Sequence, residues 1–158
     1  MIDDKQQMYT MIKSFFDESV PYAKHSGIQL IEIAEGHGSA ELPDWKDTQN
    51  HMGTQHAGAL FTVGEAASGA ASVFLFADKI MMVKAAISSA TIDYVRGARG
   101  VIRAFGKLRG SGDDILAEFS TEGRVKYIVD VSLMDSKERE VATMEVHWSV
   151  QINQPSAG

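Results

Sequence analysis

The most regular pattern of apolar and polar positions lies near the end of the chain, over Glu140–Ile152. Apolar and polar residues alternate there, position by position. The apolar set is Ala142, Met144, Val146, Trp148, Val150 and Ile152. Because successive side chains of a strand point to opposite faces, this alternation predicts a strand with one face buried.

Three further strands are predicted upstream, over residues 82–95, 101–109 and 115–134. Turn-forming residues fall at 97–100, 110–114 and 135–139. The segment 115–134 is long for one strand, so Glu122 and Gly123 are expected to mark a bulge or bend. Short turns between consecutive strands predict an antiparallel meander rather than parallel βαβ units.

The first part of the chain predicts one helix and two short strands. Apolar residues recur every three or four positions over residues 6–19, and Pro21 follows, which is typical of an amphipathic helix. Residues 28–34 and 38–42 are candidate strands around a turn at Glu35 and Gly36. Residues 43–51 are polar and irregular, which indicates a surface loop.

A different kind of helix is predicted over residues 57–76. Nearly all of its sides carry small or apolar residues, and a helix that is apolar all round must be covered all round. The small residues at 66–72 also allow a neighbouring backbone to approach closely. A sheet that curls around this helix satisfies both requirements. We therefore predict a single α+β domain over residues 1–158, with its core at about 6–152.

The composition mainly excludes several classes of site and partner. The chain has 158 residues, enough for one core, and 44% of them are apolar. It has no cysteine, which excludes disulfides, thiolate metal sites and a cysteine nucleophile. A net charge of −6 disfavours nucleic acid and anionic membranes as partners. The longest apolar stretch, 66–77, is shorter than the ~20 residues of a membrane span, and no signal peptide is evident. We expect a cytoplasmic protein.

One acidic residue stands out within the apolar helix. Glu65 is the only charged side chain between His56 and Asp78. A carboxylate in apolar surroundings usually has a partner or a raised pKa, so Glu65 is either a structural residue satisfied by a neighbour or a catalytic candidate. We favour the catalytic interpretation.

Polar residues cluster just before this helix, including Asn50 and His56. The free N–H groups at the helix start, such as those of Ala57 and Gly58, can bind negative charge developing on a carbonyl oxygen, although simple helix capping is equally common. Glu65 lies about 8 residues further on, roughly 12 Å along the helix. One carbonyl cannot touch both groups of one helix, so a shared site would require two subunits.

The pattern Asn50…Gly-Thr-Gln-His56-Ala57-Gly58…Glu65 resembles the signature of hotdog-fold acyl-CoA thioesterases, especially the phenylacetic-acid-pathway type. That family shows Asn, then Gly-Thr-x-His-Gly-Gly, then an acid nine residues after the His. The run at 90–98 resembles its strand leading into the first hairpin, and the element order agrees from about 6 to 152. Two departures stand out: the acid is Glu rather than Asp, and Ala57 replaces the first Gly.

The resemblance implies a hotdog domain, a long central helix wrapped by a curved antiparallel sheet, that hydrolyses an acyl-coenzyme A thioester as a homodimer or a dimer of dimers. It implies that Glu65 attacks the carbonyl or activates water, while the first helical N–H groups bind the oxyanion. It also implies that Asn50 orients the water or the acid, and that His56 supports the turn. Neither a metal nor a cofactor other than the substrate's coenzyme A is expected.

Two weaker expectations complete the candidate site. Residues 96–109 carry five basic residues and no acid; Arg96, Arg99 and Arg103 are candidates to meet coenzyme A phosphates, although a solvated hairpin explains them as well. Ser89 lies where the family sometimes places a hydroxyl near the acid. Two other functions stay open: a hotdog dehydratase or hydratase of acyl thioesters, and a non-catalytic acyl-CoA-binding sensor.

Overall fold

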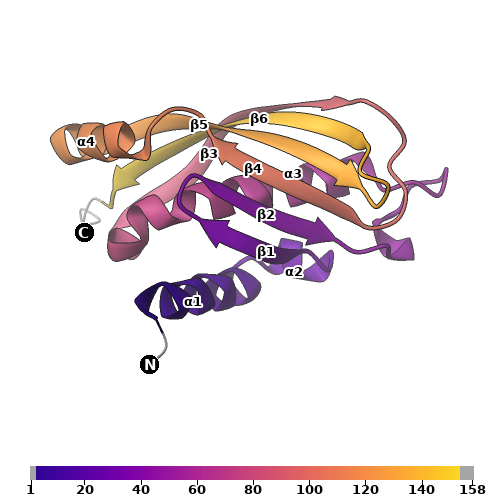
Figure 1. The fold of residues 1–158 in the computed structure, drawn as a ribbon, viewed down its shortest axis with the longest axis horizontal. Coiled ribbons are helices and arrows are strands. Elements are labelled where there is room, and N and C mark those ends of the chain that lie inside the picture. Colours follow the sequence, from indigo (N-terminus) through magenta and orange to yellow (C-terminus); the bar gives the residue numbers. More distant parts are fainter. Residues whose placement is uncertain (1–2, 154–158) are drawn as a thin grey trace, which may run out of the picture.

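One curved six-stranded antiparallel sheet wraps a long helix in the computed structural model, which describes residues 3–153 (Figure 1). The helices are α1 (Asp4–Ser19), α2 (Pro21–His25), α3 (Ala57–Ser72) and α4 (Gly112–Glu122), with 3-10 turns η1 (Lys46–Thr48) and η2 (Val73–Lys79). The strands are β1 (Gln29–Ala34), β2 (His37–Leu42), β3 (Val83–Tyr94), β4 (Ile102–Leu108), β5 (Arg124–Asp135) and β6 (Glu140–Ile152). The predicted fold class is therefore confirmed.

The strand order is β1-β2-β4-β5-β6-β3, which corrects the predicted meander. Strands β4, β5 and β6 do follow one another as neighbours, but β3 lies at the far edge, beside β6. The connection between Tyr94 and Ile102 must therefore cross three strand spacings, roughly 14 Å in all. The loop between Tyr94 and Ile102 is long enough to span this distance. Strands β3 and β4 can therefore follow one another in the sequence without being neighbours in the sheet.

The predicted strand over 115–134 is wrong in its first part, which forms α4. The Ser111 hydroxyl accepts a hydrogen bond from the Asp114 N–H, and two acidic residues occupy the first turn, where they oppose the positive helix end. Ile115 and Phe119, four residues apart, are buried on one face. Gly123 ends the helix with a positive φ of 68°, so it is a helix C-cap rather than a strand bulge.

Close contact between α3 and the sheet defines the core. Gly38 of β2 and Gly106 of β4 are paired across the sheet, directly beneath the helix. A β-carbon at Gly38 would lie 2.6 Å from the Ala70 backbone, and one at Gly106 would lie 2.6 Å from the Ala67 carbonyl oxygen. Small residues on both surfaces are therefore what lets the sheet curl around the helix.

The central helix is shorter than the predicted range 57–76. The α-helix ends at Ser72, and the chain continues as the 3-10 turn η2 with non-helical φ/ψ at Phe76. The combined segment Ala57–Lys79 is long and apolar enough to cross a membrane by composition, but 67% of its most apolar window is buried inside the protein. It is the core helix of this fold.

Replacing Gly106 with Ala tests this close approach. The added methyl group must displace the α3 backbone, so we expect a loss of about 1–3 kcal/mol in the free energy of unfolding, measured by chemical denaturation. Gly97→Ala is the matched control, because its β-carbon would make only an ordinary 3.5 Å contact with the Thr54 methyl group. Equal stability of the two variants would contradict the packing argument.

Candidate active site

A buried glutamine holds together the loops that precede α3. Gln55 is 3% exposed, and its side-chain amide donates to the carbonyl oxygens of Pro43 and Gly100 at 3.0 and 2.9 Å. Its Oε1 accepts from the Thr48 hydroxyl at 2.8 Å, and its backbone N–H donates to the Ala98 carbonyl. One side chain therefore fixes the start of α3 against two other loops. The sequence placed Gln55 near this helix end without revealing that role.

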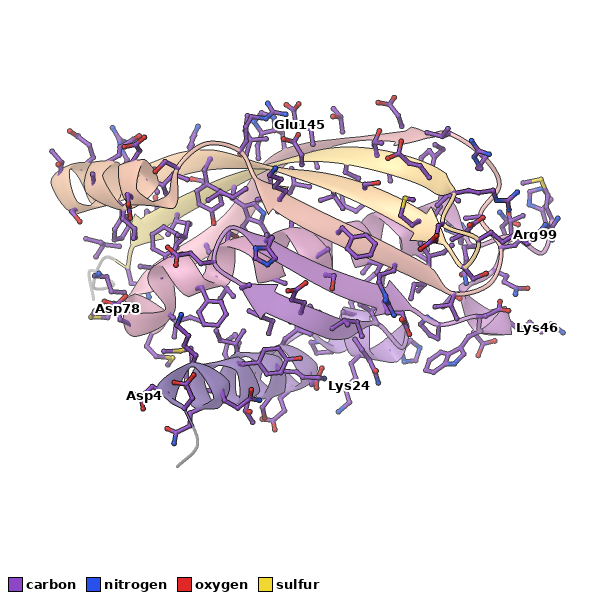
Figure 2. All side chains as sticks on the ribbon, in the orientation of Figure 1. Asp4, Lys24, Lys46, Asp78, Arg99 and Glu145 are labelled. Carbon is purple, nitrogen blue, oxygen red and sulfur yellow. The ribbon has the colours of Figure 1, made fainter. Side chains whose placement is uncertain are left out.

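Asn50 is engaged in its own loop. Its side-chain oxygen accepts from the N–H groups of Met52 and Thr54 at 2.9 and 3.2 Å, and its amide nitrogen donates to the Thr54 hydroxyl at 2.7 Å. Arg99 donates to the Gly53 carbonyl at 3.1 Å from outside the loop (Figure 2). The amide of Asn50 therefore shapes the turn that leads into α3.

His56 is the N-cap of α3. Its Nδ1 accepts a hydrogen bond of 2.9 Å from the Gly58 N–H, so the neutral ring carries its proton on Nε2. In this state His56 offers a donor rather than a base at its free nitrogen. Of the two predicted oxyanion donors, the Gly58 N–H is thus occupied. Within the described chain, the N–H of Ala57 has no hydrogen-bond partner.

Tyr94, the last residue of β3, reaches the same helix end. Its hydroxyl donates to the Ala57 carbonyl oxygen at 3.0 Å. Desolvation raises the pKa of this phenol, so it stays a neutral donor. The bond ties the end of β3 to the first turn of α3. Only the structure reveals this contact, because the two residues are 37 positions apart.

Glu65 lies on the one side of α3 that the chain leaves open. Ala57, Phe61, Glu65 and Gly69 recur every four residues and form what we call the α3 stripe; Ala57 and Glu65 are exposed, whereas most of the helix is buried. Among residues 3–153 the Glu65 carboxylate has no hydrogen-bond or ion-pair partner, and partial desolvation raises its pKa above the usual 4.5. The one side-chain hydrogen bond to this residue among residues 3–153 reaches its backbone carbonyl, which accepts from the Ser68 hydroxyl.

The structure does not bring Ser89 to the candidate acid. Ser89 is paired with His147 of β6, next to the buried Val146, and the residues buried along β6 face α3. Ser89 therefore points to the opposite side of the sheet, which we call the outer face. Within one chain it lies on the other side of the sheet from Glu65.

The three candidate arginines are also separated. Arg103 points to the outer face and forms an ion pair with Glu41 at 2.7 Å. Arg96 and Arg99 lie instead on the loop after β3; Arg99 contacts the turn that leads into α3, and the backbone N–H of Arg96 donates to the Val141 carbonyl of β6. Of the other basic residues predicted there, Arg109 bridges Asp130 and Glu145 across the outer face. Of the three candidates, Arg99 is the one with a hydrogen bond to the turn before α3, and Arg96 lies on the same loop.

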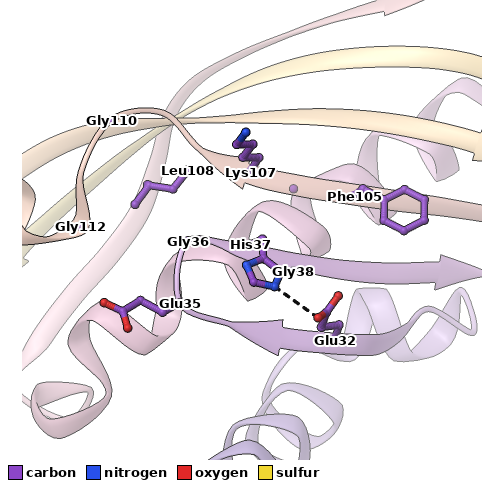
Figure 3. Close-up of a pocket in the computed structure, with 11 residues that line it drawn as sticks. Glu32, Glu35, Gly36, His37, Gly38, Phe105, Lys107, Leu108, Gly110 and Gly112 are labelled. Atoms are coloured by element: carbon purple, nitrogen blue, oxygen red, sulfur yellow. Dashed lines mark ion pairs between the residues drawn. The ribbon is translucent and has the colours of Figure 1, made fainter.

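Two grooves open on the outer face, away from the candidate acid. The larger one, of about 730 Å³, is lined by the β1–β2 turn, by β4 and by the loop before α4, and contains the His37–Glu32 ion pair of 3.3 Å (Figure 3). The second is lined by residues of β3, β4, β5 and β6, among them Asp93. Neither includes Glu65 or the start of α3. Within residues 3–153 no cluster of three His, Asp or Glu side chains could hold a metal ion.

A curved antiparallel sheet around one long helix is the hotdog fold, and solved structures of that fold match this chain. Protein PA5026 of Pseudomonas aeruginosa, described as a probable thioesterase, matches with a TM-score of 0.77 and 22% identity over 92% of this chain and 96% of its own. Thioesterase HI1161 of Haemophilus influenzae matches with a TM-score of 0.71 and 13% identity over 93% of this chain and 92% of its own. The E. coli PaaI protein matches with a TM-score of 0.65 and 19% identity over 93% of this chain and 94% of its own.

The sequence itself matches one described family. The family named Domain of unknown function (DUF4442) covers residues 9–150, so the chain belongs to that family. No curated protein matches the chain. The similarity to the solved structures therefore establishes the fold, and chemistry must be argued from the site.

Replacing Gln55 with Ala tests how the start of α3 is held. The substitution removes the partners of a buried hydroxyl and two carbonyl groups, so we expect a loss of about 1–3 kcal/mol in the free energy of unfolding. Gln49→Ala is the matched control, since among residues 3–153 the Gln49 side chain forms only an exposed hydrogen bond with Asp44, and the substitution leaves its backbone contacts in place. Similar denaturation midpoints for both variants would argue against a structural role for Gln55.

Proposed function

We propose that the protein is an acyl-CoA thioesterase, in which Glu65 of one subunit acts on a thioester held at the start of α3 of a second subunit. The observation that carries this proposal is the Glu65 carboxylate itself. Within residues 3–153 it lies unpartnered on the α3 stripe of a mostly buried helix, and its pKa is raised by desolvation.

The reaction needs a carboxylate, a hydrogen-bond donor and water. The ionised Glu65 either takes a proton from water, which then adds to the thioester carbonyl carbon, or attacks that carbon directly to give an anhydride that water cleaves. The N–H of the partner's Ala57 stabilises the negative charge on the carbonyl oxygen. The carbon–sulfur bond then breaks, and the thiolate of coenzyme A leaves and takes up a proton.

The geometry of α3 supports two subunits rather than one. Ala57 and Glu65 lie roughly 12 Å apart along one helix at about 1.5 Å per residue, too far for both to contact a single carbonyl group. The α3 stripe is also open to solvent in the single chain, as expected of a surface that another subunit covers. We propose a homodimer as the active unit, with a dimer of dimers as its larger assembly.

The substrate's coenzyme A supplies the remaining binding groups. Arg96 and Arg99 are the proposed contacts for its phosphates, because Arg99 contacts the turn that leads into α3 and Arg96 lies on the same loop. Arg103 was also a candidate, but its ion pair with Glu41 on the outer face makes it the weaker one. The thioesterase names of two similar structures agree with this chemistry. A cytoplasmic location fits a coenzyme A thioester substrate.

The dehydratase alternative is less well supported by the geometry. That chemistry requires the helix histidine as a base, whereas the Nδ1 of His56 is occupied by the Gly58 N–H and Nε2 carries the proton. The thioesterase reaction requires of His56 only that it hold the turn.

Glu65→Gln should reduce thiol release from the preferred acyl-CoA by at least ~100-fold, because an amide can neither attack the carbonyl carbon nor accept a proton from water. The assay is a panel of short, long and aromatic acyl-CoAs, followed by the release of free thiol. Glu118→Gln, an exposed glutamate on α4, is the matched control and should keep full activity. Undiminished hydrolysis by the Glu65 variant would refute the proposed mechanism, and binding without any turnover by the unaltered protein would favour an acyl-CoA sensor.

The pH dependence of kcat/KM should follow the raised pKa of Glu65. The active form is the carboxylate, so activity is present above that pKa and is lost as the pH falls through it. We expect the acid limb at a pH higher than the usual pKa of 4.5. Glu35→Gln, a variant on the outer groove, should leave the profile unchanged. An acid limb at or below pH 4.5 would contradict the role of a desolvated carboxylate.

A further inference from the structure

One aromatic side chain of the sheet reaches the central helix close to Glu65. The indole N–H of Trp148, on β6, donates to the Ser68 hydroxyl at 3.0 Å. A β-carbon at the next helix position, Gly69, would lie 3.7 and 3.9 Å from Cζ2 and Cη2 of the indole, which is an ordinary packing distance. The ring of Trp148 therefore lies against two consecutive positions of α3, the second of which has no side chain.

The indole crosses the line of Glu65 along the helix. Successive residues of an α-helix point about 100° apart, so Ser68 points about 60° to one side of Glu65 and Gly69 about 40° to the other side. A ring that contacts both positions must span the direction between them. Trp148 therefore lies across the α3 stripe about one helical turn, or ~5 Å, beyond Glu65.

Hydrogen bonds hold the ring in this orientation. The Ser68 hydroxyl accepts from the indole and donates in turn to the Glu65 carbonyl oxygen at 2.7 Å, and Ser68 is fully buried. The polar edge of Trp148 is thus satisfied inside the protein, and its hydrocarbon edge is the part that meets the α3 stripe. Because Trp148 is only half-buried, part of the ring stays accessible.

The neighbours of Trp148 on the same side of the sheet are apolar or aromatic. Ile87 of β3 is paired with Trp148 on one side and is half-buried, and Tyr127 of β5 is paired with it on the other. A charged group placed against these side chains would lose water without gaining a partner, whereas an apolar group would be stabilised. This side of Glu65 therefore suits the acyl part of a thioester, and the charged coenzyme A suits the basic loop after β3.

We propose that Trp148 ends the binding site for the acyl group, so that the protein selects short apolar acyl groups that fit between Glu65 and the indole. This inference rests on the proposed function and specifies its substrate class. With the thioester carbonyl at Glu65, an acyl group that extends along α3 toward Gly69 meets the edge of Trp148 within about one helical turn. Butyryl is a group of this size, whereas octanoyl exceeds it.

The fluorescence of Trp148 tests the contact without a change at the site. The chain has two tryptophans, so Trp45→Phe leaves Trp148 as the single indole. The probes are S-ethyl-, S-butyl- and S-octyl-CoA, thioethers that cannot be hydrolysed, and calorimetry measures their binding. S-Butyl-CoA should shift the Trp148 emission to shorter wavelength, because the alkyl group displaces water from the ring, whereas coenzyme A alone should not.

Trp148→Phe is the matched control. It leaves Trp45, which packs on Gly27 in the turn after α2, and the emission of Trp45 should not depend on the alkyl group of the probe. Binding of S-butyl-CoA without a shift in the emission of Trp148 would overturn the proposal. Failure of every thioether to bind would overturn it as well.

Chain length tests Trp148 as the limit of the acyl site. Affinity should rise about fourfold for each methylene group from S-ethyl- to S-butyl-CoA and then stay level for S-octyl-CoA. Trp148→Leu should raise the preference for S-octyl- over S-butyl-CoA at least ~10-fold, because the smaller side chain lets a longer group pass Gly69. This preference is a ratio within one variant, so partial unfolding does not alter it.

Phe61→Leu is the control for direction, since Phe61 is the half-buried aromatic residue on the other side of Glu65 in the α3 stripe. It should leave the chain-length preference unchanged. A change with Phe61→Leu but not with Trp148→Leu would place the acyl group on the opposite side of Glu65 and refute the proposal. If Trp148→Leu does not fold, the fluorescence of the intact Trp148 still decides.

The acyl site and the reaction can fail separately, because the thioether probes are not hydrolysed. A response of Trp148 together with full activity of Glu65→Gln would refute the carboxylate mechanism and leave the acyl site supported. Loss of activity in Glu65→Gln without any response of Trp148 would refute the acyl site alone.

Discussion

The close approach of α3 to the sheet at Gly38 and Gly106 is the constraint on which the rest of the structure depends. These paired glycines leave no β-carbon between the strands and the helix backbone. Their small partners on the helix, Ala67 and Ala70, have no long side chain that could hold the layers apart. The sheet can therefore bend around α3, and dispersion and burial along this contact supply the main cohesion of the domain.

This wrapping also determines what remains uncovered. Because β2 and β4 lie directly against α3, the sheet reaches the helix from one side, and the α3 stripe on the opposite side stays open. The far strand β3 lies at the edge of the sheet, and none of its inward residues is fully buried. Glu65 is therefore exposed because it lies on the side of α3 that the sheet does not cover. A carboxylate there avoids the full cost of burial while its pKa is still raised by its neighbours.

Sequence patterns predicted the parts of the fold that repeat regularly. The alternation over Glu140–Ile152 and the apolar helix after His56 were sufficient for the fold class. The patterns failed at 115–122, which was predicted as a strand but is a helix. Its buried residues Ile115 and Phe119 are apolar, as in a strand, and the helix caps that mark its ends were not recognised. The place of β3 in the sheet was also missed, because strand neighbours depend on the path of a loop. Within the site, the pattern marked Glu65 and His56, whereas the contacts of Gln55 and Tyr94 join distant segments and leave no local signal.

Tyr94 connects the edge of the sheet to the start of the core helix. Its backbone ends β3, and its hydroxyl donates to the carbonyl of Ala57, the residue whose N–H is the proposed oxyanion donor. Through this bond, the end of β3 also holds the first turn of α3, where the proposed oxyanion donor lies. A site divided between two subunits requires such a rigid link, because an error of about 1 Å in the position of a catalytic group costs much of the rate.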